Sequence, residues 1–233
     1  KQQQSMSTEK YEATAKNQVK RLRKRAAYDK KTVHEVLDAS TIAHVGFTSE
    51  DGSPFVIPML YARKDEKIYL HGSISSRLLK FLATGAQICI TVTVMDGLVV
   101  ARSVFHNSVN YRSVVVFGTG KEVVGDEKLG ALKIINDVLI PGRWEDSRLP
   151  NPTEMKATKV IVIDIEHASA KIRNEGPHDD KKDIKDPNLA HLWTGVIPFS
   201  TTTGTPVDCE DLADGVECPD YLKNYKVKSQ RTE

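Results

Sequence analysis

The chain has 233 residues, and its 33 lysines and arginines against 31 aspartates and glutamates leave a formal net charge of +2. An apolar fraction of 39 % and a charged fraction of 27 % are typical of a soluble globular protein that buries its own core. The composition excludes a transmembrane protein, a disulfide scaffold, a coiled coil and a wholly disordered chain. With three cysteines and no apolar leader segment, we expect a reducing, cytoplasmic location.

The first 27 residues are polar and then basic, with six lysines and arginines between positions 16 and 25. A basic segment of this kind can bind nucleic acid. No aromatic residue lies among these cations, and the rest of the chain balances their charge. We therefore predict a partly disordered N-terminal arm over 1–27, a single domain over 28–225 and a disordered tail over 226–233. We expect no nucleic-acid partner and no membrane partner.

Apolar spacing predicts a helix over 29–39, with Val33, Val36 and Leu37 on its inner face and a capping box from Thr32 to Glu35. The periodicity then changes to that of β-strands, which we expect over 41–47, 55–62 and 67–71. Pro58 has no amide hydrogen, so its strand should lie at a sheet edge or contain a bulge.

The second half of the chain continues this pattern. Leu78, Leu79 and Leu82 predict a short helix that ends before Gly85, and Asp96-Gly97 is a hairpin signal. Further strands are expected over 87–94, 98–104, 113–124 and 159–166, a helix over 126–140, and an apolar island over 192–199. About seven strands in hairpin order with three helices favour a mainly β fold, an antiparallel barrel with added helices.

A polar cluster occurs where a predicted strand runs into a predicted helix. Residues 71–77 comprise His71, Gly72, three serines that include Ser73 and Ser76, and Arg77. Hydroxyls, an arginine and the amides of a helix start together suit a phosphate. Serine-rich caps are also common without any ligand. A cation in the first turn opposes the helix dipole, and this favours the phosphate site.

Three other segments are weaker candidates for a binding site. The first is a polar segment with several hydrogen-bond donors and one aromatic ring, which comprises Asn110, Tyr111, Arg112 and Ser113. Such a segment either binds a ligand or forms an ordinary turn at the start of a strand. A strand interrupted by proline can offer backbone groups to a flat heterocycle; it comprises Val56, Ile57, Pro58, Met59, Leu60 and Tyr61. Trp193 lies in the polar tail and needs a cofactor, a second subunit or the barrel to pack on.

Other chemistries have little support in the sequence. The seven histidines are scattered, and there is no HxxxH or CxxC pair, so we expect no metal site. The motifs GxSxG, GxGxxG and GxxxxGK[ST] do not occur. Nucleotide binding through the folds that use those loops is therefore excluded.

Five segments in order resemble the flavin-binding split-barrel proteins related to pyridoxamine 5′-phosphate oxidase, in the branch that includes nitroimidazole-resistance proteins. They are RAAYDKKTVHEVLDAS (25–40), DGSPFVIPMLY (51–61), YLHGSISSRLLKFL (69–82), CITVTVMDGLVVARSVFHNSVNYRSVVVFG (89–118) and WTGVIP (193–198). The resemblance implies a six-stranded antiparallel split β-barrel with Greek-key connections and flanking helices. It also implies a homodimer that holds flavin mononucleotide (FMN) at the subunit interface.

The same resemblance implies roles for individual residues. The strand from Val56 to Tyr61 would line the flavin ring, followed by His71 and Gly72 after the next strand. Ser76 and Arg77 would bind the phosphate, Ser113 with Arg112 beside it would reach the flavin, and Trp193 would complete the site. The local pattern adds Ser73 to the phosphate site and Asn110 and Tyr111 to the cofactor site. His71, Tyr61 and Tyr111 are the candidates for contact with a substrate.

The sequence also departs from the pattern of true pyridoxamine phosphate oxidases. Leu78 stands where they have a lysine, Val56 where they have a basic residue and Tyr61 where they have a lysine. Their substrate-binding arginine and histidine motif is not recognisable. The resemblance therefore supports flavin binding more than oxidation of pyridoxamine phosphate.

We accordingly expect an FMN-dependent oxidoreductase that acts on a small molecule. One alternative is a flavin carrier or sensor without catalysis. Another is a haem-binding split barrel in which His106 or His178 is an axial ligand.

Overall fold

The computed structural model describes residues 9–228 and divides the chain into two compact units. Unit 1 contains the chain up to Leu37 together with 91–116 and 167–200, and unit 2 contains 38–90, 117–166 and the chain from Thr201 onward. Two long strands, β6 (Gln87–Val100) and β7 (Ser108–Glu122), contribute residues to both units.

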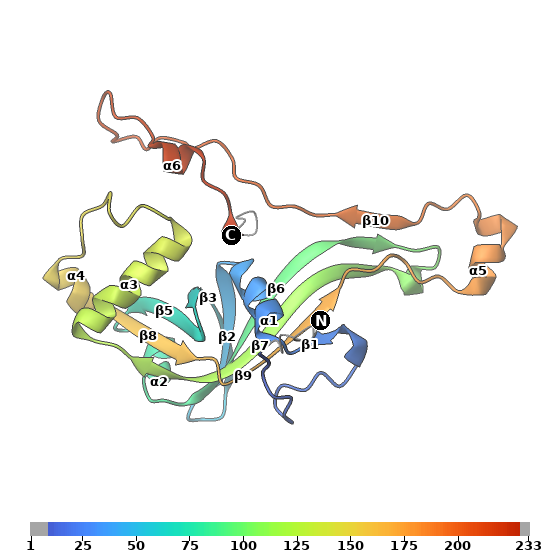
Figure 1. Ribbon diagram of the computed structural model, residues 1–233, viewed down its shortest axis with the longest axis horizontal. Coiled ribbons are helices and arrows are strands. Elements are labelled where there is room, and N and C mark those ends of the chain that lie inside the picture. The colour runs from blue at the N-terminus through green and yellow to red at the C-terminus, as the bar shows by residue number, and fades with distance from the viewer. Residues whose placement is uncertain (1–8, 229–233) are drawn as a thin grey trace, which may run out of the picture. The chain divides into compact units, whose positions relative to one another are not determined.

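Unit 2 is an antiparallel sheet with helices beside it (Figure 1). Its hydrogen-bonded strand orders are β3-β2-β6 and β7-β8-β5-β4. The other strands are β2 (Ile42–Thr48), β3 (Pro54–Leu60), β4 (Ala62–Lys64), β5 (Lys67–Ser73) and β8 (Thr158–Asp164). The helices are α2 (Arg77–Leu82), α3 (Gly125–Leu139), α4 (Pro152–Ala157) and α6 (Asp220–Lys223).

The core of unit 2 lies between the helix α3 and the strands β4, β5 and β8. Ala131 and Ile135 on the inner face of α3 pack with Ala62, Tyr69 and Val160, all of them buried. Burial of this apolar surface fixes the sheet that carries the segment 71–77.

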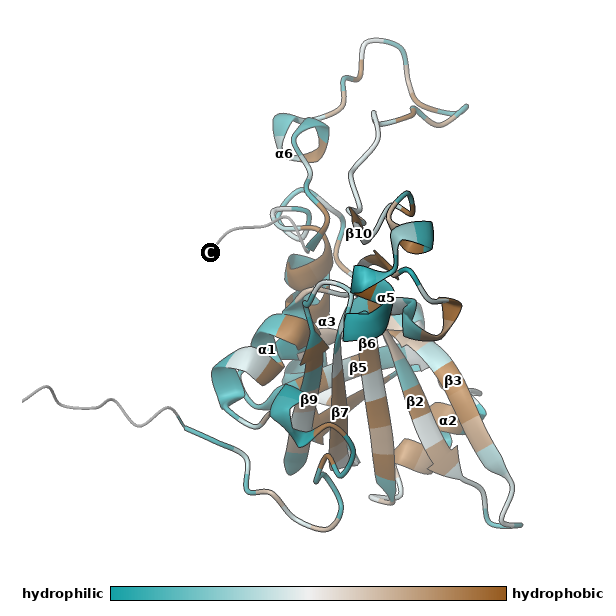
Figure 2. Ribbon diagram, turned by 90° about the vertical axis from the view of Figure 1, so that its right-hand side faces the viewer, coloured by the Kyte–Doolittle hydropathy of each residue, from teal (hydrophilic) through white to brown (hydrophobic). Residues whose placement is uncertain are grey.

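Unit 1 has the strand order β10-β6-β7-β9-β1. The additional elements are β1 (Ala26–Ala27), α1 (Lys30–Asp38), β9 (His167–Arg173), α5 (Lys181–Lys185) and β10 (Gly195–Pro198), with short 3-10 turns η1 (Arg23–Arg25), η2 (Val104–His106) and η3 (Pro187–Leu189). Along α1, apolar and polar residues alternate around the helix (Figure 2), and Val33, Val36 and Leu37 are buried.

The predicted fold class is confirmed, since the described chain is mainly antiparallel β-sheet with a few helices. The helices predicted from apolar spacing also occur, with Leu78, Leu79 and Leu82 buried and Gly85 in the left-handed region at φ +77°. The cap of α1 differs from the prediction: Asp29 Oδ1 accepts the amide of Thr32 at 2.8 Å, so aspartate caps this helix.

The hairpin predicted at Asp96-Gly97 is wrong, because β6 continues unbroken through both residues. Gly97 is used for close strand packing: a Cβ there would lie 2.6 Å from the carbonyl oxygen of Ile197 on β10. Sequence reasoning also missed β9 and the short helices α4 and α5.

Part of the predicted N-terminal arm is packed into unit 1. Tyr11 is buried, and the side-chain amide of Asn17 donates to the carbonyl of Ala168 at 2.9 Å. Ala26 and Ala27 pair with β9. Residues 1–8 of the arm and 229–233 of the predicted tail lie outside the described residues, and the domain boundaries stay predictions.

Among residues 9–228, no helix is long and apolar enough to cross a membrane. None of the three cysteines, Cys89, Cys209 and Cys218, all of them among the described residues, forms a disulfide.

Candidate functional site

The segment 71–77 is the turn that joins β5 to α2 in unit 2. His71 lies opposite Val160, and Ser73 lies opposite Thr158 in the β5–β8 ladder. The amide of Ile74 then donates to the carbonyl of Ala157 at 3.0 Å. Because the ladder and this bond fix the backbone, the polar side chains of the segment project from a defined framework.

The serine hydroxyls of this segment hydrogen-bond locally. Ser73 Oγ lies 2.8 Å from Ser75 Oγ and accepts the amide of Ser75 at 3.2 Å. Ser76 Oγ accepts the amide of Leu79 at 3.4 Å and so caps α2. A hydroxyl that accepts one bond can still donate another, so the cap leaves the Ser76 hydrogen available to an anion.

Arg77 is the cation of this segment. Its guanidinium carbon lies 3.9 Å from the ring centroid of Phe55. Within residues 9–228, the exposed guanidinium of Arg77 makes no hydrogen bond or ion pair with a protein group. The helix α2 has only six residues, so its dipole contributes little, and the arginine with the hydroxyls is the group that can bind an anion.

His71 is half-buried, and its buried Nδ1 has no hydrogen-bond partner among residues 9–228. Burial lowers the pKa of His71, which favours the neutral ring. An unpaired buried polar atom costs free energy, so Nδ1 is suited to a partner that the chain itself does not supply.

Gly72 serves packing. A Cβ at this position would lie 3.1 Å from a methyl group of Leu79, so glycine lets α2 approach β5. Leu78, which stands where true pyridoxamine phosphate oxidases have a lysine, is a core residue of the same helix.

The strand β3 lies at the edge of the sheet, next to β2, as the presence of Pro58 predicts. The register is continuous and places Pro58 opposite His44, so the alternative prediction of a bulge at Pro58 is wrong. The side chain of Val56 is 67 % exposed, whereas Ile57 and Met59 are half-buried. Leu60 packs against the core of unit 2.

Tyr61 follows β3 and is fully buried. Burial, and secondarily the charge of Asp38, raise the pKa of Tyr61 well above its usual range. The phenol of Tyr61 is therefore not accessible at the surface of the described chain, and its contact with a substrate stays a prediction.

The second polar segment predicted to bind the cofactor belongs to unit 1 and is occupied by internal bonds. Arg112 Nε and Nη2 donate to the carboxylate of Asp96 at 2.9 and 2.7 Å. Ser113 Oγ donates to the carbonyl of Lys171 at 3.2 Å. Ser113 lies in a strand as predicted, whereas Arg112 lies inside β7, which already starts at Ser108, rather than in the predicted turn.

The other predicted residues of unit 1 differ in exposure. Asn110 is buried and accepts a hydrogen bond from Arg173 Nη1 and another from the amide of Glu175. Tyr111 is half-buried. The indole of Trp193 is 62 % exposed and lies against Gly195, where a Cβ would come within 2.7 Å of the ring.

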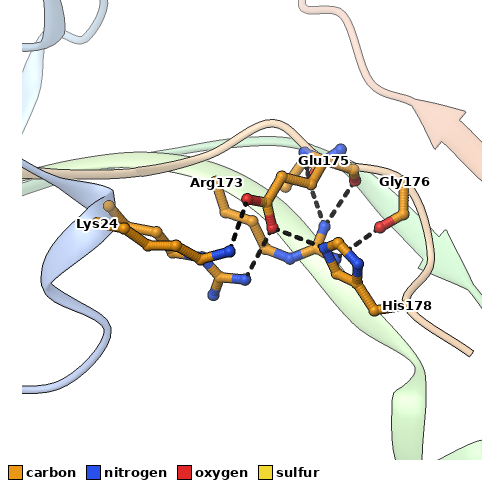
Figure 3. Close-up of polar contacts among 7 residues, drawn as sticks. Lys24, Arg173, Glu175, Gly176 and His178 are labelled. Carbon is orange, nitrogen blue, oxygen red and sulfur yellow. Dashed lines mark hydrogen bonds and ion pairs between the residues drawn. The ribbon is translucent and has the colours of Figure 1, made fainter. Parts of the chain in front are cut away.

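A cluster that sequence reasoning missed lies at the end of β9 (Figure 3). Arg173 is 3 % exposed, and its guanidinium donates to two backbone carbonyls as well as to Asn110. Glu175 pairs with Arg25 at 3.1 Å, Lys24 at 3.5 Å and His178 at 2.9 Å. These hydrogen bonds to His178 and Arg25 lower the pKa of Glu175 to about 2.

The two histidines predicted as haem ligands both lie beside carboxylates in unit 1. His178 Nε2 contacts Glu175, and His106 Nε2 lies 3.6 Å from Asp180. Within the part of the chain that the structure describes, no group of three histidines, cysteines or carboxylates could hold a metal ion.

Comparison with known proteins places this geometry in context. A family model described as pyridoxamine 5′-phosphate oxidase matches residues 29–172. The flavocytochrome Anf3 from Azotobacter vinelandii is 35 % identical, with 92 % of this chain and 98 % of that chain covered and a TM-score of 0.83. A FAD and haem binding protein from Mycobacterium smegmatis is 33 % identical, with 87 % and 98 % covered and a TM-score of 0.81.

A putative 5-nitroimidazole antibiotic resistance protein from Bacteroides thetaiotaomicron is 21 % identical, with 63 % of this chain and 86 % of that chain covered. Its TM-score of 0.54 indicates a similar fold. The comparison with curated proteins finds no match.

Proposed function

Because the chain belongs to the pyridoxamine 5′-phosphate oxidase-like family of flavin-binding split barrels, we propose that it binds a flavin nucleotide and acts as a flavin-dependent oxidoreductase on a small molecule. The observation that carries this proposal is Arg77, an exposed arginine that no described protein group pairs, beside the hydroxyls of Ser73 and Ser76. An arginine and hydroxyls are the donors that a phosphate monoester requires.

The residues of unit 2 fit a flavin in three respects. Arg77, Ser73 and Ser76 would hold the phosphate, the edge strand β3 would lie along the flavin ring, and the unpaired Nδ1 of His71 would hydrogen-bond a polar atom of the ligand. A bound flavin supplies the electron-transfer chemistry, and the protein supplies binding and orientation.

We propose FMN as the flavin. Arg77 is the only lysine or arginine among residues 71–77, and one arginine suits one phosphate group. FAD, which the M. smegmatis relative is described as binding, has a second phosphate that needs further donors.

The visible absorption spectrum of the purified protein, followed by heat release and mass determination of the chromophore, tests this function. We expect a flavin spectrum and the mass of FMN. Release of FAD would correct the choice of nucleotide. A colourless protein that takes up neither FMN nor FAD would overturn flavin binding.

A second candidate is a protein that carries haem as well as flavin. It is favoured because two relatives above 30 % identity are described as a flavocytochrome and as a FAD and haem binding protein. His178 supports this candidate, since a metal-bound histidine usually has its other ring nitrogen held by a carboxylate or carbonyl, and Glu175 holds one nitrogen of His178.

Haem reconstitution separates the two candidates. We expect wild-type protein to give a haem absorption band and the double variant His106→Ala, His178→Ala to lose it. A double variant that retains haem would reject both residues as ligands. A wild type that takes up no haem would reject the second candidate and leave flavin binding as the proposed function.

We further propose that the working form is a homodimer. Support comes from unit 1, where Val104 and Phe105 in η2 are 87 % and 88 % exposed and β10 exposes Ile197. Exposed apolar side chains of this kind mark surfaces that bind another protein. Light scattering should give twice the chain mass, and Phe105→Asp should shift it toward the monomer; a wild-type monomer at micromolar concentration would contradict the dimer.

A further inference from the structure

Arg77 lies at one end of an aromatic stack in unit 2. The rings of Phe47 and Phe55, which face each other across β2 and β3, lie 5.3 Å apart with their planes inclined by 18°. The ring of Phe81 also contacts Phe47, with the ring centroids 4.8 Å apart and the planes inclined by 34°. The stack therefore runs Phe81, Phe47, Phe55 and Arg77.

Both ends of this stack belong to the helix α2. Arg77 and Phe81 are four residues apart, so their side chains lie on the same face of the helix. Phe47 is buried, which gives Phe55 a fixed neighbour. Helix α2, with the proposed phosphate donors at its start, is thus joined through side chains to the edge strand proposed to line the flavin ring.

The contact also restricts the arginine itself. An exposed arginine has many rotamers, and it must lose that freedom when it binds a phosphate. At 3.9 Å the guanidinium carbon is in contact with the face of the Phe55 ring, which attracts a cation. No described protein group takes the N–H donors of Arg77, so they remain available to phosphate oxygens.

From this geometry we propose that Phe55 is a positioning residue that orients Arg77 for the phosphate, so that the site selects phosphorylated flavins over riboflavin. The proposal rests on the proposed flavin function. Phe55 acts through Arg77 and has no chemical role of its own. Its removal should therefore weaken binding only of ligands that carry a phosphate.

Titration of the apoprotein with FMN and with riboflavin, which has the same ring but no phosphate, tests this role. Phe55→Leu keeps apolar bulk and removes the aromatic face. We expect its dissociation constant for FMN to rise about two- to fivefold, the range of a partly exposed cation–π contact, with that for riboflavin unchanged. Phe55→Tyr should restore FMN binding, and Phe55→Leu added to Arg77→Ala should have no further effect.

Tyr221→Leu on α6 is the matched control, because it makes the same kind of substitution in unit 2 away from the segment 71–77. Thermal unfolding of every variant checks the fold, and Phe55→Met replaces Phe55→Leu if the latter does not fold. Equal loss of FMN and riboflavin binding, or no loss of either, would overturn the role of Phe55. A wild type that binds none of FMN, riboflavin and FAD would overturn the proposed flavin function as well.

Discussion

Two polar segments have the same kinds of residue but are used differently. In unit 2, the side chains of Ser73 and Arg77 have no partner among the described residues beyond Ser75 and the ring of Phe55. In unit 1, Arg112 and Ser113 bond to Asp96 and to the backbone of Lys171. The sequence predicts both segments as cofactor ligands, and the structure distinguishes them by which donors already have a partner.

A candidate ligand site therefore differs from a structural network in whether its side-chain donors already bond to protein groups, and not in the types of residue it contains. A donor that already bonds a carboxylate or carbonyl must break that bond before it can hold a ligand. A donor without a partner gains a bond when the ligand arrives. Substitutions in the polar segment of unit 2 should therefore weaken ligand binding. Substitutions in the polar segment of unit 1 should lower the free energy of unfolding.

The largest effect is expected for Arg77→Ala. Loss of charge-assisted hydrogen bonds worth about 1.5–3 kcal/mol should raise the dissociation constant for FMN roughly ten- to hundredfold. The free energy of unfolding should change by less than about 0.5 kcal/mol, because Arg77 is exposed and makes no ion pair with a described group. Fluorescence titration and urea unfolding measure the two quantities; full FMN affinity in this variant would place the phosphate elsewhere.

For Asn110→Ala we expect a loss of stability without a loss of FMN affinity. The variant removes an acceptor from the buried guanidinium of Arg173 and should lower the free energy of unfolding by about 2 kcal/mol. Its folded fraction should bind FMN as tightly as wild type. Asn110→Asp keeps an acceptor and serves as the control, which should lose less stability. If Asn110→Ala instead weakens FMN binding without loss of stability, the assignment of Asn110 to the structural network is wrong.

Ser113→Ala should also lower the free energy of unfolding, by a smaller amount. The variant loses one neutral hydrogen bond to Lys171, worth about 1 kcal/mol of the free energy of unfolding. The resemblance implies that Ser113 reaches the flavin, so this variant tests that role directly. A clear loss of FMN affinity would restore Ser113 to the ligand site.

The smallest effect concerns acid sensitivity. The pKa of Glu175 is about 2 in the folded chain, below its ordinary value of 4.5, so its ion pairs stabilise the fold above about pH 4.5. That contribution is lost as the pH falls from about 4.5 toward 2, because the unfolded chain takes up the proton first. Chemical unfolding across this range should show a shallower pH dependence for Glu175→Gln than for wild type, and identical slopes would contradict the assignment.

The elements that follow from local pattern are predictable from the sequence. Apolar spacing is sufficient for α1 and α2, and the missing amide hydrogen of Pro58 is sufficient for an edge strand. Gly97 shows where local pattern fails, since its position in β6 depends on the close approach of β10, a segment about 100 residues later in the chain.

The candidate site is predictable only as far as it depends on local sequence pattern. The composition of residues 71–77 indicates a phosphate site, but only the structure shows that Arg77 is stacked on Phe55 and has no ion-pair partner in the described part of the chain. The buried environment of Arg173 could not be predicted, because backbone carbonyls supply two of its acceptors and carry no sequence signal.

The most direct test of the proposed phosphate site is a crystal structure of the protein reconstituted with FMN. We expect the phosphate at hydrogen-bond distance, about 2.7–3.2 Å, from the guanidinium of Arg77 and from a hydroxyl of Ser73 or Ser76, with Phe55 still against the guanidinium. A phosphate held by other residues, with Arg77 in contact only with Phe55, would contradict the proposed site.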